Sequence, residues 1–155
     1  MAWFRWLSGG TRGAEGEPPG SDAIWSPDGR YGLRRGELSE IRMGSPQFGP
    51  VEVLGSPCST HGRSFGQAGA FSEDSRHLAI EELVSHDPPA TRVIVFDLAS
   101  GSELVAHNQA PGFIRLLQWI APGRLAISAW SHLAGTSEHI YSMPSSSASP
   151  QPEQS

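Results

Sequence analysis

The one stretch of this chain whose spacing matches a catalytic motif is Gly62-Arg63-Ser64-Phe65-Gly66. It follows the pattern G-x-S-x-G, in which a serine nucleophile sits on a sharp turn between a strand and a helix. Asp97 and His107 follow in the order Ser, Asp, His that one group of hydrolases uses. The sequence on both sides of Ser64 is loop-like, and no amphipathic helix follows it. We therefore expect no enzyme and no catalytic residue, and keep a small serine hydrolase that uses Ser64 as an alternative.

Residues that could hold a metal or a cofactor are sparse. The closest pairs of possible metal ligands are Cys58-x-x-His61 and His132 with His139, and neither has a second pair at zinc-site spacing. All 11 basic residues are arginines, so a Walker lysine or a Schiff-base lysine is excluded. No glycine-rich phosphate loop lies between a strand and a helix. We expect no metal and no cofactor.

Charge and cysteine content restrict the partners and the compartment. The formal net charge of -5 argues against a nucleic-acid partner, which would require a basic patch. Cys58 is the single cysteine, so an internal disulfide is impossible. The apolar start, MAWFRWLSGG, is interrupted by Arg5 and is too short for a signal peptide or a membrane span. We expect a cytoplasmic location.

The elements that must position these residues are predicted to be strands. With 18 glycines and 13 prolines, the chain suits many turns and no helical bundle. Three stretches repeat one pattern: WSPDGRYGL from Trp25, FSEDSRHLA from Phe71 and WIAPGRLAI from Trp119. Their offsets (25 to 71 and 71 to 119) fall in the range of about 40–50 residues that is typical of repeated β-meanders. We predict eleven or twelve short strands.

The sequence divides into a central domain with two flanking segments. Residues 1–20 are an aromatic, Gly/Pro-rich N-terminal segment, 21–143 are a β-meander domain, and 144–155 are a tail that we expect to be disordered. Within the domain the units cover about 21–57, 70–107 and 112–143. A long connection is predicted over 56–69 and a loop over 85–91, between strands at 77–84 and 92–98.

These repeats resemble a known family of β-structures. The turns WSPDGR at Trp25 and FSEDSRHLAIEE at Phe71 are similar to the aromatic-Ser-Pro-Asp-Gly turn of TolB-type and WD-repeat β-propeller blades. RVIVFDLASGSEL, from Arg92, resembles the segment between the third and fourth strands of such blades. The resemblance covers about 120 residues and implies an all-β fold of three antiparallel β-meanders, but it leaves the function open because such blades host many activities.

Three units are too few to close a ring, because propellers typically need about four to eight blades. An incomplete propeller or a sandwich-like pack would leave sheet faces uncovered. The Trp-rich N-terminus, a second copy of the chain or another protein are the available covers. The N-terminal aromatics alternatively serve as a membrane-surface contact or a partner anchor.

These features together predict a non-catalytic protein-binding module. The most specific hypothesis is a bacterial immunity protein that neutralises a toxin by direct binding, with acidic side chains that mimic the charge of a substrate. Glu81 and Glu82 must face opposite sides of a strand, and we expect the inward one to be solvated at the end of the sheet. The alternative to binding is a scaffold that completes a propeller by self-association as a homodimer. The candidate partner-binding residues are Glu81, Glu82, Asp87, Trp130, Trp3 and Trp6.

Overall fold

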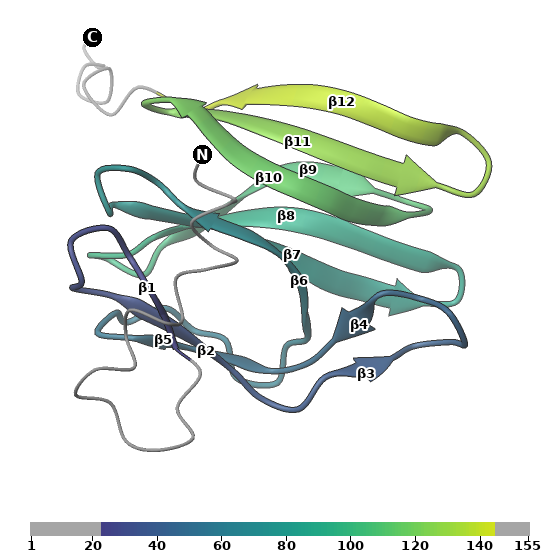
Figure 1. The fold of residues 1–155 in the computed structure, drawn as a ribbon, viewed down its shortest axis with the longest axis horizontal. Coiled ribbons are helices and arrows are strands. Elements are labelled where there is room, and N and C mark those ends of the chain that lie inside the picture. Colours follow the sequence, from purple (N-terminus) through teal and green to yellow (C-terminus); the bar gives the residue numbers. More distant parts are fainter. Residues whose placement is uncertain (1–22, 145–155) are drawn as a thin grey trace, which may run out of the picture.

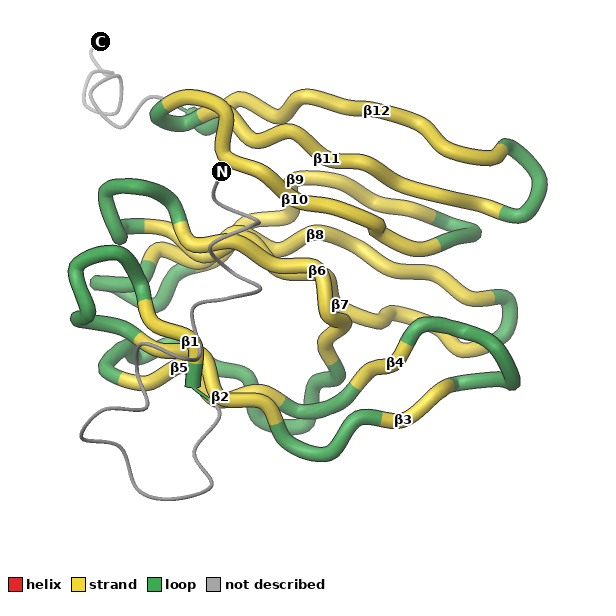
Figure 2. The backbone as a smooth tube through the Cα atoms, in the orientation of Figure 1, coloured by secondary structure: helices red, strands yellow, loops and turns green. Residues whose placement is uncertain are grey.

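The computed structural model describes residues 23–144, and this part of the chain consists of strands and loops without a helix (Figure 2). The predictions for the N-terminal segment 1–20, with Trp3 and Trp6, and for the tail beyond residue 144 lie outside the described residues. The strands are β1 (Ile24–Trp25), β2 (Gly32–Arg35), β3 (Ser39–Glu40), β4 (Gln47–Phe48), β5 (Val51–Leu54), β6 (Phe65–Phe71), β7 (His77–His86), β8 (Pro89–Asp97), β9 (Glu103–Gln109), β10 (Phe113–Ala121), β11 (Arg124–Ser131) and β12 (Gly135–Ser142).

The strands form antiparallel sheets that lie one above another (Figure 1). The first sheet has the order β1-β2-β5, the middle sheet β6-β7-β8-β9 and the third sheet β10-β11-β12, while β3 and β4 pair as a separate hairpin. The all-β prediction is confirmed, and the sheets do not close into a barrel. This stack is compatible with both predicted arrangements, an incomplete propeller and a sandwich-like pack.

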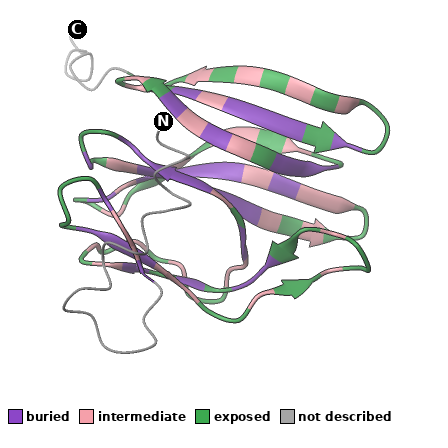
Figure 3. Ribbon diagram, viewed as in Figure 1, coloured by how far each residue is buried: buried purple, intermediate pink, exposed green. Residues whose placement is uncertain are grey.

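The middle sheet has buried side chains on both faces, because it lies between the first and third sheets and successive side chains of a strand point to opposite sides, whereas its edge strand β9 has no buried residue. On β7, Leu78 and Ile80 pack into a core shared with the first sheet, whereas Ala79 packs into a second core shared with the third sheet. The almost continuous apolar run of β8 is explained in the same way, since Ile94 belongs to the first core and Val95 to the second. Figure 3 shows buried stretches along β6, β7 and β8 of the middle sheet.

The first two repeats fold into the same turn. In the first, the Ser26 hydroxyl donates to the Asp28 carboxylate at 2.9 Å and accepts from the backbone N–H of Tyr31. In the second, the Ser72 hydroxyl donates to Asp74 at 2.6 Å and accepts from the N–H of His77. Each aspartate also accepts a backbone N–H two residues further on, so the repeated Ser-x-Asp spacing closes both turns.

The third repeat is joined to the second through its aromatic residue. Trp119 is buried in the second core, where its indole N–H donates to the Ala70 carbonyl at 3.0 Å. The ring of His77 stacks on the same indole with centroids 5.9 Å apart. Burial lowers the pKa of His77, which favours the neutral imidazole in this stack. Trp119 therefore fixes the third sheet against the middle one.

Two predicted loops are shorter than expected. The predicted connection 56–69 is wrong at its end, because β6 begins at Phe65 and pairs with β7 despite its glycines. The predicted loop 85–91 is also wrong, because Ser85 pairs with Ala90 and His86 with Pro89, which leaves a two-residue turn. In both places pairing with β7 outweighs the turn preference of Gly and Pro.

Candidate protein-binding groove

A groove of about 750 Å³ lies where the inner strands of the middle and third sheets meet. Its walls come from β6 and from the first half of β10, and its rim includes side chains of β11 and β12. The lining is mainly apolar, as is usual for sites that bind part of a ligand or partner. The principal side chains are Ala68, Phe113, Ile114, Leu116, Leu117 and Trp130.

Trp130 is the largest exposed group of this groove. The residue is 36% exposed, and its indole lies nearly parallel to the ring of Phe113, with ring centroids 6.4 Å apart. The ring of Phe113 also contacts the ring of Phe48, with centroids 6.0 Å apart. The ring of His132 approaches Trp130 edge-on, again with centroids 6.0 Å apart. These ring contacts hold the Trp130 indole in place and leave part of it exposed.

A buried carboxylate contributes to the floor of the groove. Glu81 is only 1% exposed, and its carboxylate accepts the backbone N–H of Ile114 at 2.8 Å. Burial raises the pKa of Glu81 to about 7, although the hydrogen bonds from Ile114 and Thr91 and the charge of Arg35 oppose this shift. The contact joins β7 to β10 and so fixes one wall of the groove to its floor.

Gly66 leaves room for the Glu81 side chain, and Arg35 binds the backbone of β6 at that point. A Cβ atom at Gly66 would meet the Glu81 side chain, so a residue without a side chain is required there. The guanidinium of Arg35 donates to the Gly66 carbonyl at 2.6 Å and to the Gln67 carbonyl at 3.3 Å. Burial lowers the pKa of Arg35 to about 10, and the charge of Glu81 opposes this effect.

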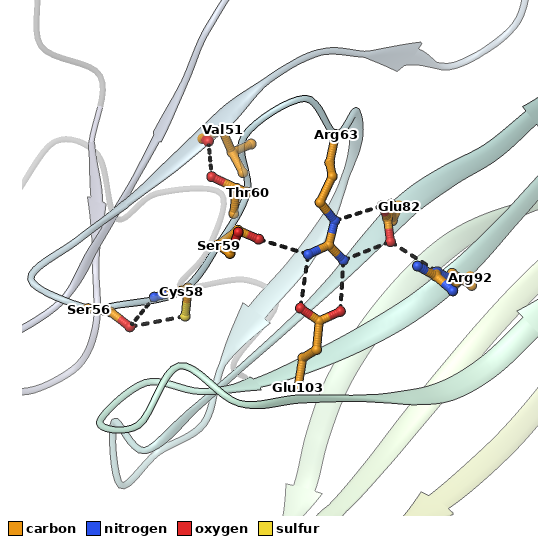
Figure 4. A network of polar contacts seen from close by, with 9 residues as sticks. All are labelled: Val51, Ser56, Cys58, Ser59, Thr60, Arg63, Glu82, Arg92 and Glu103. Carbon is orange, nitrogen blue, oxygen red and sulfur yellow. Dashed lines mark hydrogen bonds and ion pairs between the residues drawn. The ribbon is translucent and has the colours of Figure 1, made fainter.

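Glu82 lies on the opposite face of β7 and has two arginine partners (Figure 4). Arg63 donates to its carboxylate at 2.9 and 3.0 Å, and Arg92 at 3.0 Å. Burial alone raises the pKa of Glu82, but the hydrogen bonds from both arginines outweigh it and lower the pKa below its ordinary value. Arg63 also forms two bonds of 2.9 Å with Glu103 and donates to the Ser59 carbonyl, which ties the 56–64 connection to the middle sheet.

The acidic candidates have different surroundings. Glu81 and Glu82 do face opposite sides of β7, as predicted, but the expectation that the inward glutamate is solvated is wrong. Contacts from neighbouring sheets and loops cover both carboxylates, so neither presents a free charge on the surface. Asp87 is 89% exposed at the β7–β8 turn, where it pairs with Arg42 at 3.2 Å. Its role in binding a partner stays a prediction.

The three residues of the hydrolase alternative do not form a catalytic triad. Ser64 lies just before β6, where its carbonyl accepts the N–H of Leu83. Asp97 accepts the backbone N–H groups of Ala99 and Ser100 and pairs with Arg76. His107 is hydrogen-bonded to Gln109 at 2.9 Å and faces another histidine, so neither residue orients a base toward Ser64.

Three of the candidate metal ligands contact other residues. The Cys58 thiol lies 3.0 Å from the Ser56 hydroxyl, and burial raises its pKa. His132 contacts Trp130, whereas the ring of His139 lies 4.3 Å from that of His107, on the neighbouring sheet. Within residues 23–144, no three His, Cys, Asp or Glu side chains gather as a metal site.

The groove itself has no signal in the sequence. Phe113, Ile114 and Leu116 belong to a stretch that predicts an ordinary strand. The Arg63–Glu82 contact joins residues 19 positions apart, and no sequence motif marks it. A loop arginine and a mid-strand glutamate are common, and only the fold brings them together.

Comparison with known proteins gives no assignment: no family model, no curated protein and no solved structure matches this chain. In the described residues we find no helix of the length and apolarity required to span a membrane. The fold defines an all-β protein with antiparallel sheets.

Proposed function

We propose that this protein is a non-catalytic protein-binding module and that the groove beside Trp130 receives a side chain of the partner. The observation that supports this proposal is the partly exposed Trp130, which stacks on Phe113 and lines an apolar groove. Tryptophan in a supported, partly open pocket is typical of the few residues that dominate binding energy at interfaces. A partner side chain that displaces water there would bury apolar surface on both proteins.

The test is native mass spectrometry of the tagged chain purified gently from its own host. We expect a second, different chain at fixed stoichiometry, and we expect Trp130→Ala to lose it, because truncation at an interface centre typically costs about 2 kcal/mol or more. Leu133→Ala is the matched control, since Leu133 is 87% exposed and lies outside the groove. A partner retained by Trp130→Ala would contradict the groove as the binding site, and a chain that always stays alone would contradict the binding role.

The finer proposal is that the partner is a toxin and that this chain acts as a cytoplasmic immunity protein. The acidic net charge of -5 and the exposed Asp87 support a basic partner surface. Co-production with the product of a neighbouring toxin gene should protect the host, and Asp87→Asn should weaken that protection. Failure of the wild-type chain to protect would exclude this form of the proposal, while binding to another protein would remain measurable.

Self-association is the second candidate function. The specific observation in its favour is the outer face of the third sheet, where Ile140 is 52% exposed beside the half-buried Ala126. A homodimer without another chain in the same spectrum would favour a scaffold that completes a larger propeller.

A further inference from the structure

The aromatic residue that opens each repeat packs toward the sheet before its own. Phe71, which opens the second repeat, lies in the core that the middle sheet shares with the first. Trp119, which opens the third repeat, lies in the core that the third sheet shares with the middle one, and its indole N–H donates to the Ala70 carbonyl. The same position of the repeat therefore joins each of these sheets to its predecessor.

Trp25 opens the first repeat, and no sheet precedes it among residues 23–144. Its neighbour Ile24 packs against the first core, so Trp25 points to the outer face of the first sheet. A Cβ atom at Gly32 would meet the six-membered ring of this indole, which places the indole over β2. The indole N–H is buried and finds no acceptor within the described residues. A buried donor without an acceptor is costly, so a partner for it is expected.

A row of three paired residues forms the surface that receives Trp119. Ala70 of β6 pairs with Ala79 of β7, and Ala79 pairs with Val95 of β8. All three residues belong to the second core, and each is at most 1% exposed. These residues are the receiving row of the middle sheet.

The third sheet has a receiving row at the same three positions. Gln118, directly before Trp119, pairs with Ala126, and Ala126 pairs with Ile140. Their neighbours along each strand face the second core, so this row lies on the outer face of the third sheet. Ile140 is 52% exposed there, although Val95, its counterpart in the middle sheet, is buried. The first and third sheets end the stack of residues 23–144, and no described sheet covers this row (Figure 1).

We propose that a second copy of this chain packs the outer face of its first sheet on the outer face of the third sheet, with its Trp25 on the receiving row of Gln118, Ala126 and Ile140. The Trp25 N–H of one copy then donates to the Gln118 carbonyl of the other, as Trp119 donates to Ala70 within one chain. This contact rests on the self-association proposed as the second candidate function, and it specifies the two surfaces that meet.

The contact is head-to-tail, because each copy has one face with Trp25 and one receiving row. Head-to-tail contacts close into a ring or continue as a filament, depending on the rotation between the copies. Two copies with three stacked sheets each bring six sheets together, within the range of about four to eight that radial arrangements of small sheets contain. We therefore expect a closed dimer with two identical contacts. Packing the third sheet on a copy of itself would leave the Trp25 N–H without an acceptor.

The dissociation constant of the dimer, measured by analytical ultracentrifugation and native mass spectrometry of the full chain, tests the contact. Ile140→Asp places a charge on the receiving row and should raise this constant at least about 30-fold. Trp25→Phe keeps an aromatic ring but removes the donor, and should raise it about tenfold. Met43→Asp is the matched control and should leave it unchanged, because Met43 is 96% exposed in the connection between β3 and β4.

The alternative results separate the proposals. A monomer at every concentration would overturn the contact and self-association together, and would assign the cover of Trp25 to its own chain. A complex with a different chain and no homodimer would also overturn the contact, while the groove beside Trp130 would stand as the binding site. A homodimer that tolerates both Trp25→Phe and Ile140→Asp would preserve self-association and overturn this contact alone.

A mixing experiment tests the head-to-tail direction. Trp25→Ala lacks the inserted indole and Ile140→Asp lacks an apolar receiving row, so each variant alone should be monomeric. Their mixture should form a heterodimer through its one intact contact, which native mass spectrometry distinguishes by mass. Homodimers of Trp25→Ala as stable as those of the wild type would show that two third sheets pack on each other. That result, or the absence of a heterodimer when circular dichroism shows both variants folded, would overturn the proposal.

Discussion

The Glu81 carboxylate accepts the backbone N–H of Ile114 at 2.8 Å, so an ionisable side chain of the middle sheet holds the first strand of the third sheet. The carboxylate is almost completely buried, and burial raises its pKa from the ordinary 4.5 to about 7. The strength of this contact and the free-energy cost of the buried charge therefore depend on pH near neutrality.

Replacing Glu81 by glutamine should stabilise the protein at alkaline pH. The folded state holds a proton that the unfolded state releases between pH 4.5 and about 7, so the Glu81 contribution to stability falls as pH rises through this window. Glutamine still accepts the Ile114 N–H and carries no charge. The difference in unfolding free energy, Glu81→Gln variant minus wild type, should rise by up to about 3 kcal/mol between pH 5 and pH 8 in urea titrations. A difference independent of pH would show that Glu81 does not titrate in this range.

Gly66→Ala should destabilise the protein through the same carboxylate. The added methyl group would meet the ring of Phe48 and the Glu81 side chain, and Glu81 is fixed by its hydrogen bond and cannot move into solvent. We expect a loss of about 1–3 kcal/mol in thermal or urea unfolding. In a Glu81→Ala background the same substitution should cost less, with the contact to the Phe48 ring accounting for the remaining loss, and fully additive effects of the two changes would contradict the clash with Glu81.

Arg63→Gln should be among the more damaging polar substitutions. The substitution removes the ion pair of Arg63 with the buried Glu82 carboxylate, which keeps its ion pair with Arg92. It also removes the ion pair with Glu103 that ties the 56–64 connection to the middle sheet. We expect a loss of about 2–4 kcal/mol in unfolding free energy, typical of a broken buried ion pair. Arg34→Gln removes the exposed pair with Glu52 and serves as control, with an expected change of about 0.5 kcal/mol or less. Equal effects of both substitutions would contradict the importance of burial.

Two substitutions at Ser75 distinguish the stabilising effect of a hydrogen bond from the destabilising effect of backbone strain. Its φ of 63° lies in the left-handed region, and its buried hydroxyl accepts the Asp28 N–H at 2.9 Å, which joins the turns of the first two repeats. Ser75→Ala loses the bond and keeps the strain, whereas Ser75→Gly loses the bond and relieves the strain. The glycine variant should therefore be more stable than the alanine variant by about 1 kcal/mol. Equal stabilities would show that the backbone is not strained.

The repeated turns and the strands were predictable because they depend on local sequence. The spacing of Ser26 and Asp28, and of Ser72 and Asp74, closes its turn within six residues, so a short pattern contains the whole interaction. Gly29 in the first turn and Ser75 at the corresponding position of the second both have the left-handed backbone conformation. The similarity of the two stretches does not reveal that a serine adopts this conformation.

The groove and the buried charges were not predictable because they depend on contacts between sheets. Glu81 meets a backbone N–H 33 residues away, and Glu82 meets Arg63 from the other side of the same strand. A pair of adjacent glutamates in a strand normally indicates solvent exposure. Only the positions of the first and third sheets show that both sides of β7 are covered.

The alternation of β7 makes the chain intolerant of a change in length at that strand. Deletion of one residue in its N-terminal half would exchange the two cores: Leu78 and Ile80 would trade places with their smaller or charged neighbours, and Glu82 would leave its arginines. Deletion of two residues would keep each side chain on its own face and shift it along the strand. Only a change by an even number of residues keeps each side chain of β7 on its own face. Natural variation in the length of β7 should therefore occur in steps of two.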